Sequence, residues 1–305
     1  MLAHVLGAAA GGGFPQWNCG CRLCRAVREG APGLARRTQT SAAVSPDGRR
    51  WFLLGASPDV RAQIEAFPPL WPRSPRGSPI EGVLLPSADV DATAGLFSMR
   101  EGEPIALHAT ARVLDAFLER NALAATLRRS ASQLTAHVLP LGTAVSIRDR
   151  AGEASGLEVT ALAAPGKPPP HLAGRPYHPE DNVGFLVRDT AAREVLAFFP
   201  CVGALDDALL AAVGGATALL FDGTFWSDDE LVRVAPDAPT ARVMAHVPVG
   251  GPDGSLARLA RAGARRRFFV HVNNTNPMLD ERGPERAEVR AAGWEVALDG
   301  TEVLP

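Results

Sequence analysis

Short apolar runs recur along the chain, each bounded by Gly, Pro or Asp. Runs of this length and composition predict buried strands. The predicted strands cover residues 2–7, 51–55, 82–85, 104–108, 183–187, 195–199, 216–221, 268–272 and 294–298. Segments with helical spacing alternate with them, at residues 59–67, 111–121, 206–213, 255–264 and 284–292. This alternation predicts an α/β fold in which helix layers cover sheets.

The middle of the chain follows a different pattern. Residues 126–163 contain strand-like pieces at 136–139, 143–147 and 157–161, separated by turn residues and without a strong helix. This succession of strands indicates a second sheet. The Pro-rich segment 164–181 is a long irregular connection, and such loops in compact domains are usually functional or mobile. We expect a single domain over residues 1–305.

Composition narrows the classes of function. A formal net charge of −2, with no basic face, argues against nucleic-acid binding. The opening run of small residues lacks the basic segment of a signal peptide. No stretch approaches the roughly 18 to 20 continuous apolar residues of a membrane-spanning helix. We therefore expect a cytoplasmic protein that does not insert into a membrane.

Three of the four cysteines lie within six positions of one another: Cys19, Cys21 and Cys24. A disulfide framework would spread its pairs along the chain, so this clustering indicates a metal. Gly20 lets the loop wrap a small ion, and three thiolates favour zinc. The fourth ligand must come from a distant segment, with Asn274, His271 or a water as candidates. We expect a structural zinc site that fastens the loop 13–26 to the rest of the chain.

Two aspartates follow the predicted strand 82–85 directly. Asp89 and Asp91 would lie at the carboxyl end of that strand, where ligands bind in layered α/β sheets. Aspartates before a helix are often only caps, but two histidines have a comparable context. His271 lies in the apolar run 268–272, and we expect His246 at another strand end, in VMAHV. Hard oxygen ligands at such an edge favour Fe(II), Mn(II) or Mg(II).

Five segments carry a resemblance to a known family. They are GAAAGGGFPQWNCGCRLC at 7–24, RTQTSAAVSPDG at 37–48, ASPDVRAQI at 56–64, LLFDGT at 219–224 and HVNNTNPMLDERGPERAEV at 271–289. Together they resemble the coenzyme PQQ synthesis protein B family, nearly end to end. That family belongs to the metallo-β-lactamase superfamily. The resemblance implies a metallo-β-lactamase-like αββα sandwich, with a metal at the edge where strands of both sheets end.

The resemblance also places the superfamily's metal motifs on this chain. The first motif, His-x-His-x-Asp-His, falls on residues 87–92, with Asp91 as its aspartate. Both early histidines are absent, as is usual in this family, but Ala92 stands where the family has its final histidine. The next superfamily ligand falls near Asp181. The bridging aspartate of the superfamily has no clear counterpart around residues 200–201.

Further residues acquire roles from the same resemblance. His271 matches the final metal-binding histidine, and His246 matches a histidine of the related phosphodiesterase branch. Asp222 falls where that branch carries an acidic residue behind the ligands. The three cysteines match the family's structural zinc site. The implied ligands of the edge metal are Asp89, Asp91, His271 and, as a further candidate, Asp181, and the implied catalytic residues are Asp91, His246 and Asp222.

The resemblance implies a role in pyrroloquinoline quinone (PQQ) biosynthesis. Two carboxylates and one imidazole leave coordination positions open, as in non-haem iron oxygenases. The resemblance further implies an enzyme that uses Fe²⁺ or another divalent metal to oxidise or hydroxylate a tyrosine-derived precursor made from Glu-Tyr. A homodimer is left open.

Two other hypotheses remain. Ala92 favours a non-catalytic protein that carries or transports PQQ or its precursor, or that serves as a scaffold for another biosynthetic protein. A metal hydrolase of the phosphodiesterase type is the third hypothesis. It needs a dinuclear site, for which few ligands remain.

Overall fold

The computed structural model describes residues 1–128 and 133–304. Within these residues the strands form two seven-stranded sheets. The first sheet contains, in chain order, β1 Leu2–Gly7, β2 Ser41–Ser45, β3 Trp51–Leu54, β4 Ile80–Leu84, β5 Ile105–Ala109, β6 Leu134–Val138 and β14 Glu302–Leu304. Its spatial order is β14-β1-β2-β3-β4-β5-β6, so the last strand of the chain pairs with the first.

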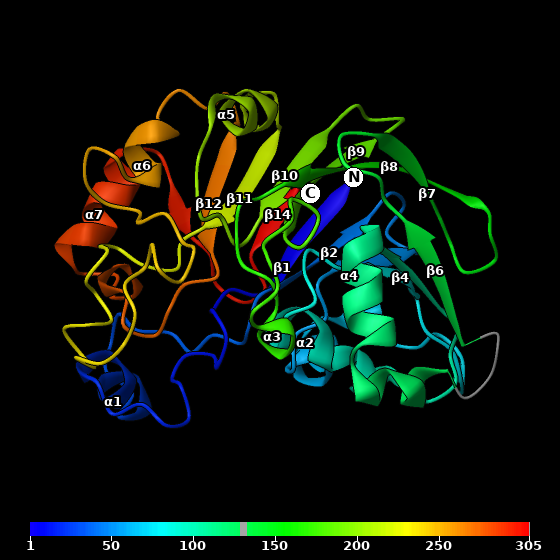
Figure 1. Ribbon diagram of the computed structural model, residues 1–305, viewed down its shortest axis with the longest axis horizontal. Helices are drawn as coiled ribbons and strands as arrows, with labels where there is room; N and C mark the ends of the chain where they lie inside the picture. Colours follow the sequence, from blue (N-terminus) through cyan, green and yellow to red (C-terminus); the bar gives the residue numbers. More distant parts are fainter. Residues whose placement is uncertain (129–132, 305) are drawn as a thin grey trace.

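The second sheet follows along the chain and faces the first (Figure 1). It contains β7 Ala144–Arg148, β8 Ala154–Ala163, β9 Val183–Asp189, β10 Val195–Phe199, β11 Ala218–Asp222, β12 Arg266–Val270 and β13 Glu295–Val296. Its spatial order is β13-β12-β11-β10-β9-β8-β7. The four strands from β10 to β13 are parallel, which explains why β10 to β12 read as nearly continuous apolar runs.

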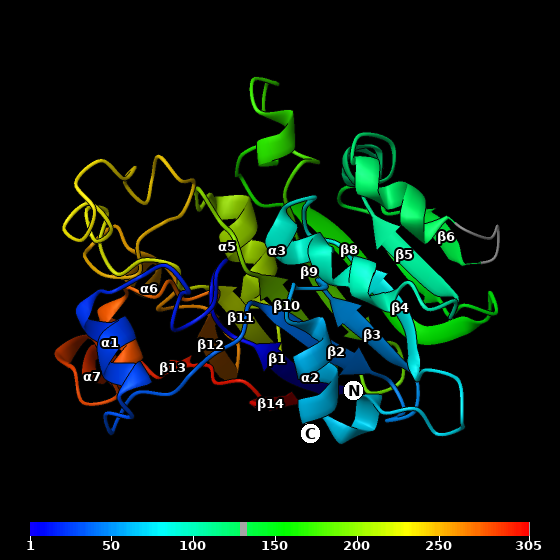
Figure 2. The same ribbon diagram turned by 90° about the horizontal axis from the view of Figure 1, so that it is seen from below.

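Helices cover the outer face of each sheet. They are α1 Arg22–Arg28, α2 Val60–Ala66, α3 Val90–Thr93, α4 Ala111–Leu114, α5 Asp207–Gly214, α6 Ser255–Arg258 and α7 Pro284–Ala291. Single turns extend several of them, and a π-helical turn at Asp115–Glu119 continues α4. In Figure 2, α2 and α3 lie on the side of the first sheet, and α1, α6 and α7 lie beside the second.

Alternating side chains of single strands divide the core into layers. Phe198 of β10 is buried between the two sheets, whereas its neighbour Phe199 is buried beneath the helices of the second sheet. Leu53 of β3 points to the helices of the first sheet, and Leu54 points between the sheets. Because successive side chains of a strand face opposite sides, each sheet is apolar on both faces. The αββα sandwich implied by the sequence is confirmed.

Backbone hydrogen bonds join the two sheets at one edge. Val183 N–H at the start of β9 donates to Pro86 O after β4, at 2.8 Å. Nearby, Val272 N–H after β12 donates to Ala8 O after β1, at 2.9 Å. Loops from both sheets are thereby fixed against one another at this edge. Residues that follow β4, β10 and β12 come together between these two bridges.

Two strands and one helix were not predicted from the sequence. Strand β2 is made of small residues, SAAVS, and β14 has only three residues, so neither gives a strong apolar signal. Helix α1 lies within the segment that was expected to be only a loop. The helix forms because Cys21 caps its amino end. None of the helices in the described part of the chain has the length and continuous apolar character that crossing a bilayer requires.

Candidate metal centres

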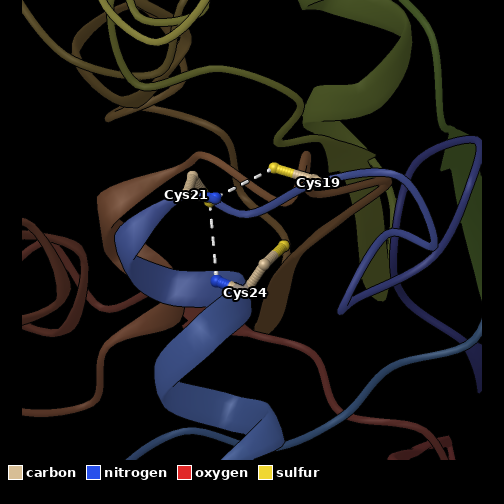
Figure 3. A group of neighbouring side chains, drawn as sticks. All are labelled: Cys19, Cys21 and Cys24. Atoms are coloured by element: carbon tan, nitrogen blue, oxygen red, sulfur yellow. Dashed lines mark hydrogen bonds between the residues drawn. The ribbon is translucent and has the colours of Figure 1, made fainter.

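The three clustered cysteines converge on one point at the start of α1 (Figure 3). Cys21 N–H donates to Cys19 Sγ at 3.4 Å, and Cys24 N–H donates to Cys21 Sγ at 3.5 Å. The three sulfurs lie within 4.8 Å of one another. A tetrahedral zinc with Zn–S bonds of about 2.3 Å holds its sulfurs about 3.8 Å apart. The cysteine group therefore fits a zinc ion after small side-chain movements.

Asn274 is the distant residue that completes this group. Its amide nitrogen lies 3.4 Å from Cys24 Sγ, and a half-turn of the amide places its oxygen there instead. Burial raises the pKa of the Cys24 thiol to about 11, so a bound cation is needed to hold that sulfur as a thiolate. Of the candidates for the fourth ligand, the structure brings Asn274 to the cysteines. His271 belongs to a different group.

A second group of polar side chains lies at the edge where the sheets are bridged. Asp91 comes from the loop and first turn after β4, and His271 follows β12 directly. Asp91 Oδ2 lies 3.0 Å from His271 Nε2. Asp89 directly precedes the short helix α3, which carries Asp91. Of the two aspartates expected after the strand 82–85, Asp91 therefore contacts His271, and Asp89 lines the same cavity.

Hydrogen bonds to Thr224 and Asp222 fix both histidine rings. Asp222 Oδ2 lies 2.7 Å from His246 Nδ1, and a carboxylate only accepts, so this nitrogen carries the proton. Thr224 Oγ1 donates to Asp222 Oδ1 at 2.6 Å and therefore accepts from His271 Nδ1 at 2.8 Å. The rings stack with centroids 5.5 Å apart. Each Nδ1 is held by the protein, so Nε2 is the nitrogen with which each ring can bind a metal.

The backbone is strained beside both histidines. Ala245 and His271 have φ values of 63° and 55°, in the left-handed region that side-chain-bearing residues rarely adopt. Such a conformation costs about 1–3 kcal/mol and occurs mainly at functional sites. At His271 it turns the chain sharply at the end of β12, which points the ring into the edge site.

Cys201 also belongs to this site, although no role was predicted for it from the sequence. Its sulfur lies 3.6 Å from His271 Nε2. One ligand atom from each of Cys201, His246 and His271 lies within 4.8 Å of the others. Cys201 follows Pro200 immediately after β10, so it stands at a strand end like the other site residues. That position after an apolar run was the available signal.

Burial and mutual charge set the protonation of the site. Burial raises the pKa of Asp89 to about 7, and the neighbouring Asp91 adds to the effect. Burial also opposes ionisation of Asp91, but the hydrogen bond and charge of His271 lower its pKa overall. Burial disfavours the charged form of His271, yet Cys201 and Asp91 raise its pKa well above the usual value. Burial raises the pKa of Cys201 to about 11.

A cavity of about 470 Å³ opens onto these groups. Its wall includes Asp89, Asp91, Cys201, His246 and His271. Further polar side chains of the lining include Gln39, Lys167, Asn182 and Asn273. Lys167 comes from the long connection 164–181, part of which projects at the top of Figure 2. The cavity is large enough for a small organic molecule next to the metal-binding groups.

Two expectations about this site are corrected. His246 does not end a strand. It follows the turns at residues 241–245, and its N–H donates to Ala241 O. Asp181 does not line the cavity among the described residues. Its carboxylate is bound by Arg112 Nε at 2.7 Å and by His178 N–H at 2.8 Å. Asp222, by contrast, is fully buried behind His246, where the resemblance placed an acidic residue.

Comparison with known proteins identifies the family. Residues 50–272 match the model of the beta-lactamase superfamily domain. A coenzyme PQQ synthesis protein B of Rhodopseudomonas palustris is 43% identical over 309 residues, with 98% of each chain covered. The chain belongs to the coenzyme PQQ synthesis protein B family. It therefore has a role in PQQ biosynthesis.

Other members and neighbours agree with this assignment. The family member of Xanthomonas campestris pv. campestris is 42% identical, with 99% of each chain covered. The crystal structure of zinc-bound PqqB from Methylobacterium extorquens superposes with a TM-score of 0.92 at 41% identity, over 100% of both chains. A diphosphatase of the PhnP family shares the fold alone, at 17% identity and a TM-score of 0.67. The zinc-bound relative and the cysteine group together support a metal cofactor for this chain.

Proposed function

We propose that this chain oxidises or hydroxylates a tyrosine-derived PQQ precursor at a single metal on the edge shared by the two sheets. The observation that carries the proposal is the contact of 3.0 Å between Asp91 and His271 on the wall of the 470 Å³ cavity. These groups offer a carboxylate oxygen and an imidazole nitrogen. His246, held by Asp222, offers a second imidazole nitrogen nearby.

We assign iron to this edge site. Two imidazoles and a carboxylate with open positions are typical of non-haem Fe(II) oxygenases. A bound Fe(II) would supply the activation of O₂ that oxidation of a phenol ring requires. Asp91 and His271 would hold the metal directly, and Asp222 would orient His246 toward it. Among the residues that the structure describes, the metal-binding groups at this edge form one cluster, which favours a single metal over the dinuclear site of a hydrolase.

Other residues of the cavity would bind the precursor and move protons. A precursor made from Glu-Tyr carries carboxylates, and Lys167 supplies a cation on the cavity wall. Asp89 has a pKa of about 7, so it exchanges a proton near neutral pH. We assign to Asp89 the proton transfers at the phenol hydroxyl. His246 and His271 are buried, which would limit the access of bulk water to the metal from their side.

The remaining expectations complete the proposal. Cys19, Cys21, Cys24 and Asn274 would hold a structural zinc. This zinc would fix α1 against the segment that follows β12. Residues 1–305 would act as one metallo-β-lactamase-like domain. The reaction would take place in the cytoplasm. The precursor would be the molecule that binds in the cavity.

Turnover of the precursor tests this function. The chain is loaded anaerobically with Fe(II), mixed with the tyrosine-derived precursor and exposed to isotopically labelled O₂. Mass spectrometry should detect product that carries labelled oxygen or has lost hydrogen. Asp91→Asn should abolish the product, and Asp181→Asn should retain it, because Asp181 is paired with Arg112 away from the cavity. The proposal would be overturned if the iron-loaded chain binds the precursor but the mass of the precursor stays the same.

That contrary result would support a carrier. Ala92 favours this second candidate, because it places a methyl group where the family has a histidine ligand. Ala92 is nearly buried and lies beside His271 and Cys201 around a small cavity. A carrier would show precursor affinity by calorimetry in the absence of iron, with equal affinity in Asp91→Asn.

A further inference from the structure

We propose that Cys201 is a ligand of the edge metal and takes the coordination position left by the histidine that this chain lacks at Ala92. The inference rests on the proposed metal at this edge and adds one residue to it. The resulting site would contain two imidazoles, one carboxylate and one thiolate. The expectation drawn from the sequence was a site of carboxylates with a single imidazole.

The position of the sulfur is the first argument. Cys201 Sγ lies 3.6 Å from His271 Nε2, and Asp91 Oδ2 lies 3.0 Å from the same nitrogen. A ring nitrogen of His246 completes a group within 4.8 Å of the sulfur. Metal–ligand bonds of about 2.0–2.3 Å place neighbouring ligand atoms about 3–4 Å apart. These atoms therefore surround a space suited to one metal ion.

The small cavity beside Ala92 is the second argument. A hole of about 20 Å³ is lined by Ala92, Asp91, Cys201 and His271, among others. A histidine at position 92 would project from α3 into this region. The sulfur and the missing imidazole therefore border the same space. Cys201 follows β10 of the second sheet, as His271 follows β12, and it supplies a ligand atom that Ala92 on α3 does not.

The geometry disfavours a different use of this thiol, as a nucleophile activated by histidine. In such a triad the carboxylate and the nucleophile bind opposite nitrogens of the imidazole. Here Asp91 and Cys201 approach the same nitrogen of His271, while Thr224 holds the other. A carboxylate and a thiol that approach the same ring nitrogen, while the protein holds the other nitrogen, are typical of a metal site.

A thiolate ligand would change which metals bind. Carboxylates and imidazoles alone accept Mg(II) and Mn(II), whereas a thiolate favours Fe(II), Co(II) and Zn(II) over both. The thiolate also provides a spectroscopic signature, because thiolate-to-cobalt charge transfer absorbs in the near ultraviolet. Cobalt can therefore report on Cys201 without any measurement of turnover.

The test uses the full chain with zinc already in its cysteine group. Co(II) is titrated into the unaltered chain and into Cys201→Ser, Ala92→His and the double variant Ala92→His/Cys201→Ser. The unaltered chain should bind one cobalt with a charge-transfer band. Cys201→Ser should lose the band and bind cobalt at least about tenfold more weakly. The double variant should recover the affinity without the band, and Ala92→His alone should keep the band.

Three outcomes would overturn the inference. If the unaltered chain binds cobalt without the band, and Cys201→Ser binds it equally well, Cys201 is not a ligand, although the edge metal stands. If the band persists in Cys201→Ser, it arises from the cysteine group near α1. If the unaltered chain binds no cobalt beyond the zinc-filled group, the proposed function fails together with this inference.

Discussion

Asp91 Oδ2 lies 3.0 Å from His271 Nε2, although 180 positions of sequence separate the two residues. Asp91 follows a strand of the first sheet and His271 follows a strand of the second. Their contact therefore exists only where the edges of the two sheets are bridged. A proton between these atoms occupies the position that a metal would take, so metal binding at this edge displaces a proton.

The Asp222→Asn variant should weaken the edge metal. Asp222 Oδ2 holds His246 Nδ1 at 2.7 Å, and loss of such an orienting carboxylate typically costs about 10–100-fold in metal affinity. Competition titration with a chelator measures the change. Asp222 also accepts a hydrogen bond from Val202 N–H, so the Asp222→Asn variant should lose some folding stability as well.

Asp299→Asn is the matched control for that loss of stability. Asp299 is a partly buried carboxylate that also accepts from backbone N–H groups, those of Ala8 and Thr38. It does not line the cavity among the described residues. The Asp299→Asn variant should be less stable than the unaltered chain but should bind the edge metal with the same affinity. Equal affinities in Asp222→Asn and the unaltered chain would contradict the role given to Asp222.

Cys24→Ser should remove the structural zinc and loosen the amino-terminal segment. Leu23 and Val27 pack α1 onto the core of the second sheet, and the zinc would hold the start of this helix in place. We expect one zinc fewer per chain and a fall in Tm of at least about 5 °C. Limited proteolysis should then cut within residues 13–29. Cys201 lies outside this cysteine group, so the Cys201→Ser variant is the control and should keep the zinc and resist cleavage. An unchanged Tm in Cys24→Ser would contradict a structural role for the zinc.

His108 should make the fold sensitive to acid. It is buried on β5 and stacks on His137, and burial, reinforced by His137, lowers its pKa from 6.5 to about 4. Between these values the unfolded chain binds a proton that the folded chain does not, so stability falls as the pH falls through this window. The full effect is about 3 kcal/mol.

Urea unfolding at several pH values measures this effect. Between pH 6.5 and 4, the free energy of unfolding should fall less steeply in His108→Gln than in the unaltered chain. Equal slopes in the two proteins would show that His108 does not carry the acid sensitivity.

The fold could be predicted largely from strand patterns. Strand β10 was predicted with its observed bounds, Val195–Phe199, because sheets buried on both faces produce continuous apolar runs. Strand β2 was missed because the small residues of Ser41–Ser45 fill a crowded core without a large apolar side chain. The predicted helix at 255–264 was too long. Regular helix ends at Arg258, and turns follow it.

The site could be predicted only in part. Strand ends located Asp91 and His271, because ligands gather where strands of a layered fold end. Asp181 could not be judged from sequence, since its partner Arg112 lies 69 positions earlier in the chain. Cys201 was missed for the same reason. Its significance depends on His271 and Ala92, which are close only in three dimensions.

Metal content tests the account most directly. The chain is purified without added metal, reconstituted anaerobically with Fe(II), desalted and analysed for its elements, alongside His271→Ala and Asp181→Asn. We predict about one zinc and one iron per unaltered chain, with the iron absent from His271→Ala and retained in Asp181→Asn. Zinc alone in all three proteins, or iron that survives in His271→Ala, would contradict a metal centre at the edge of the two sheets.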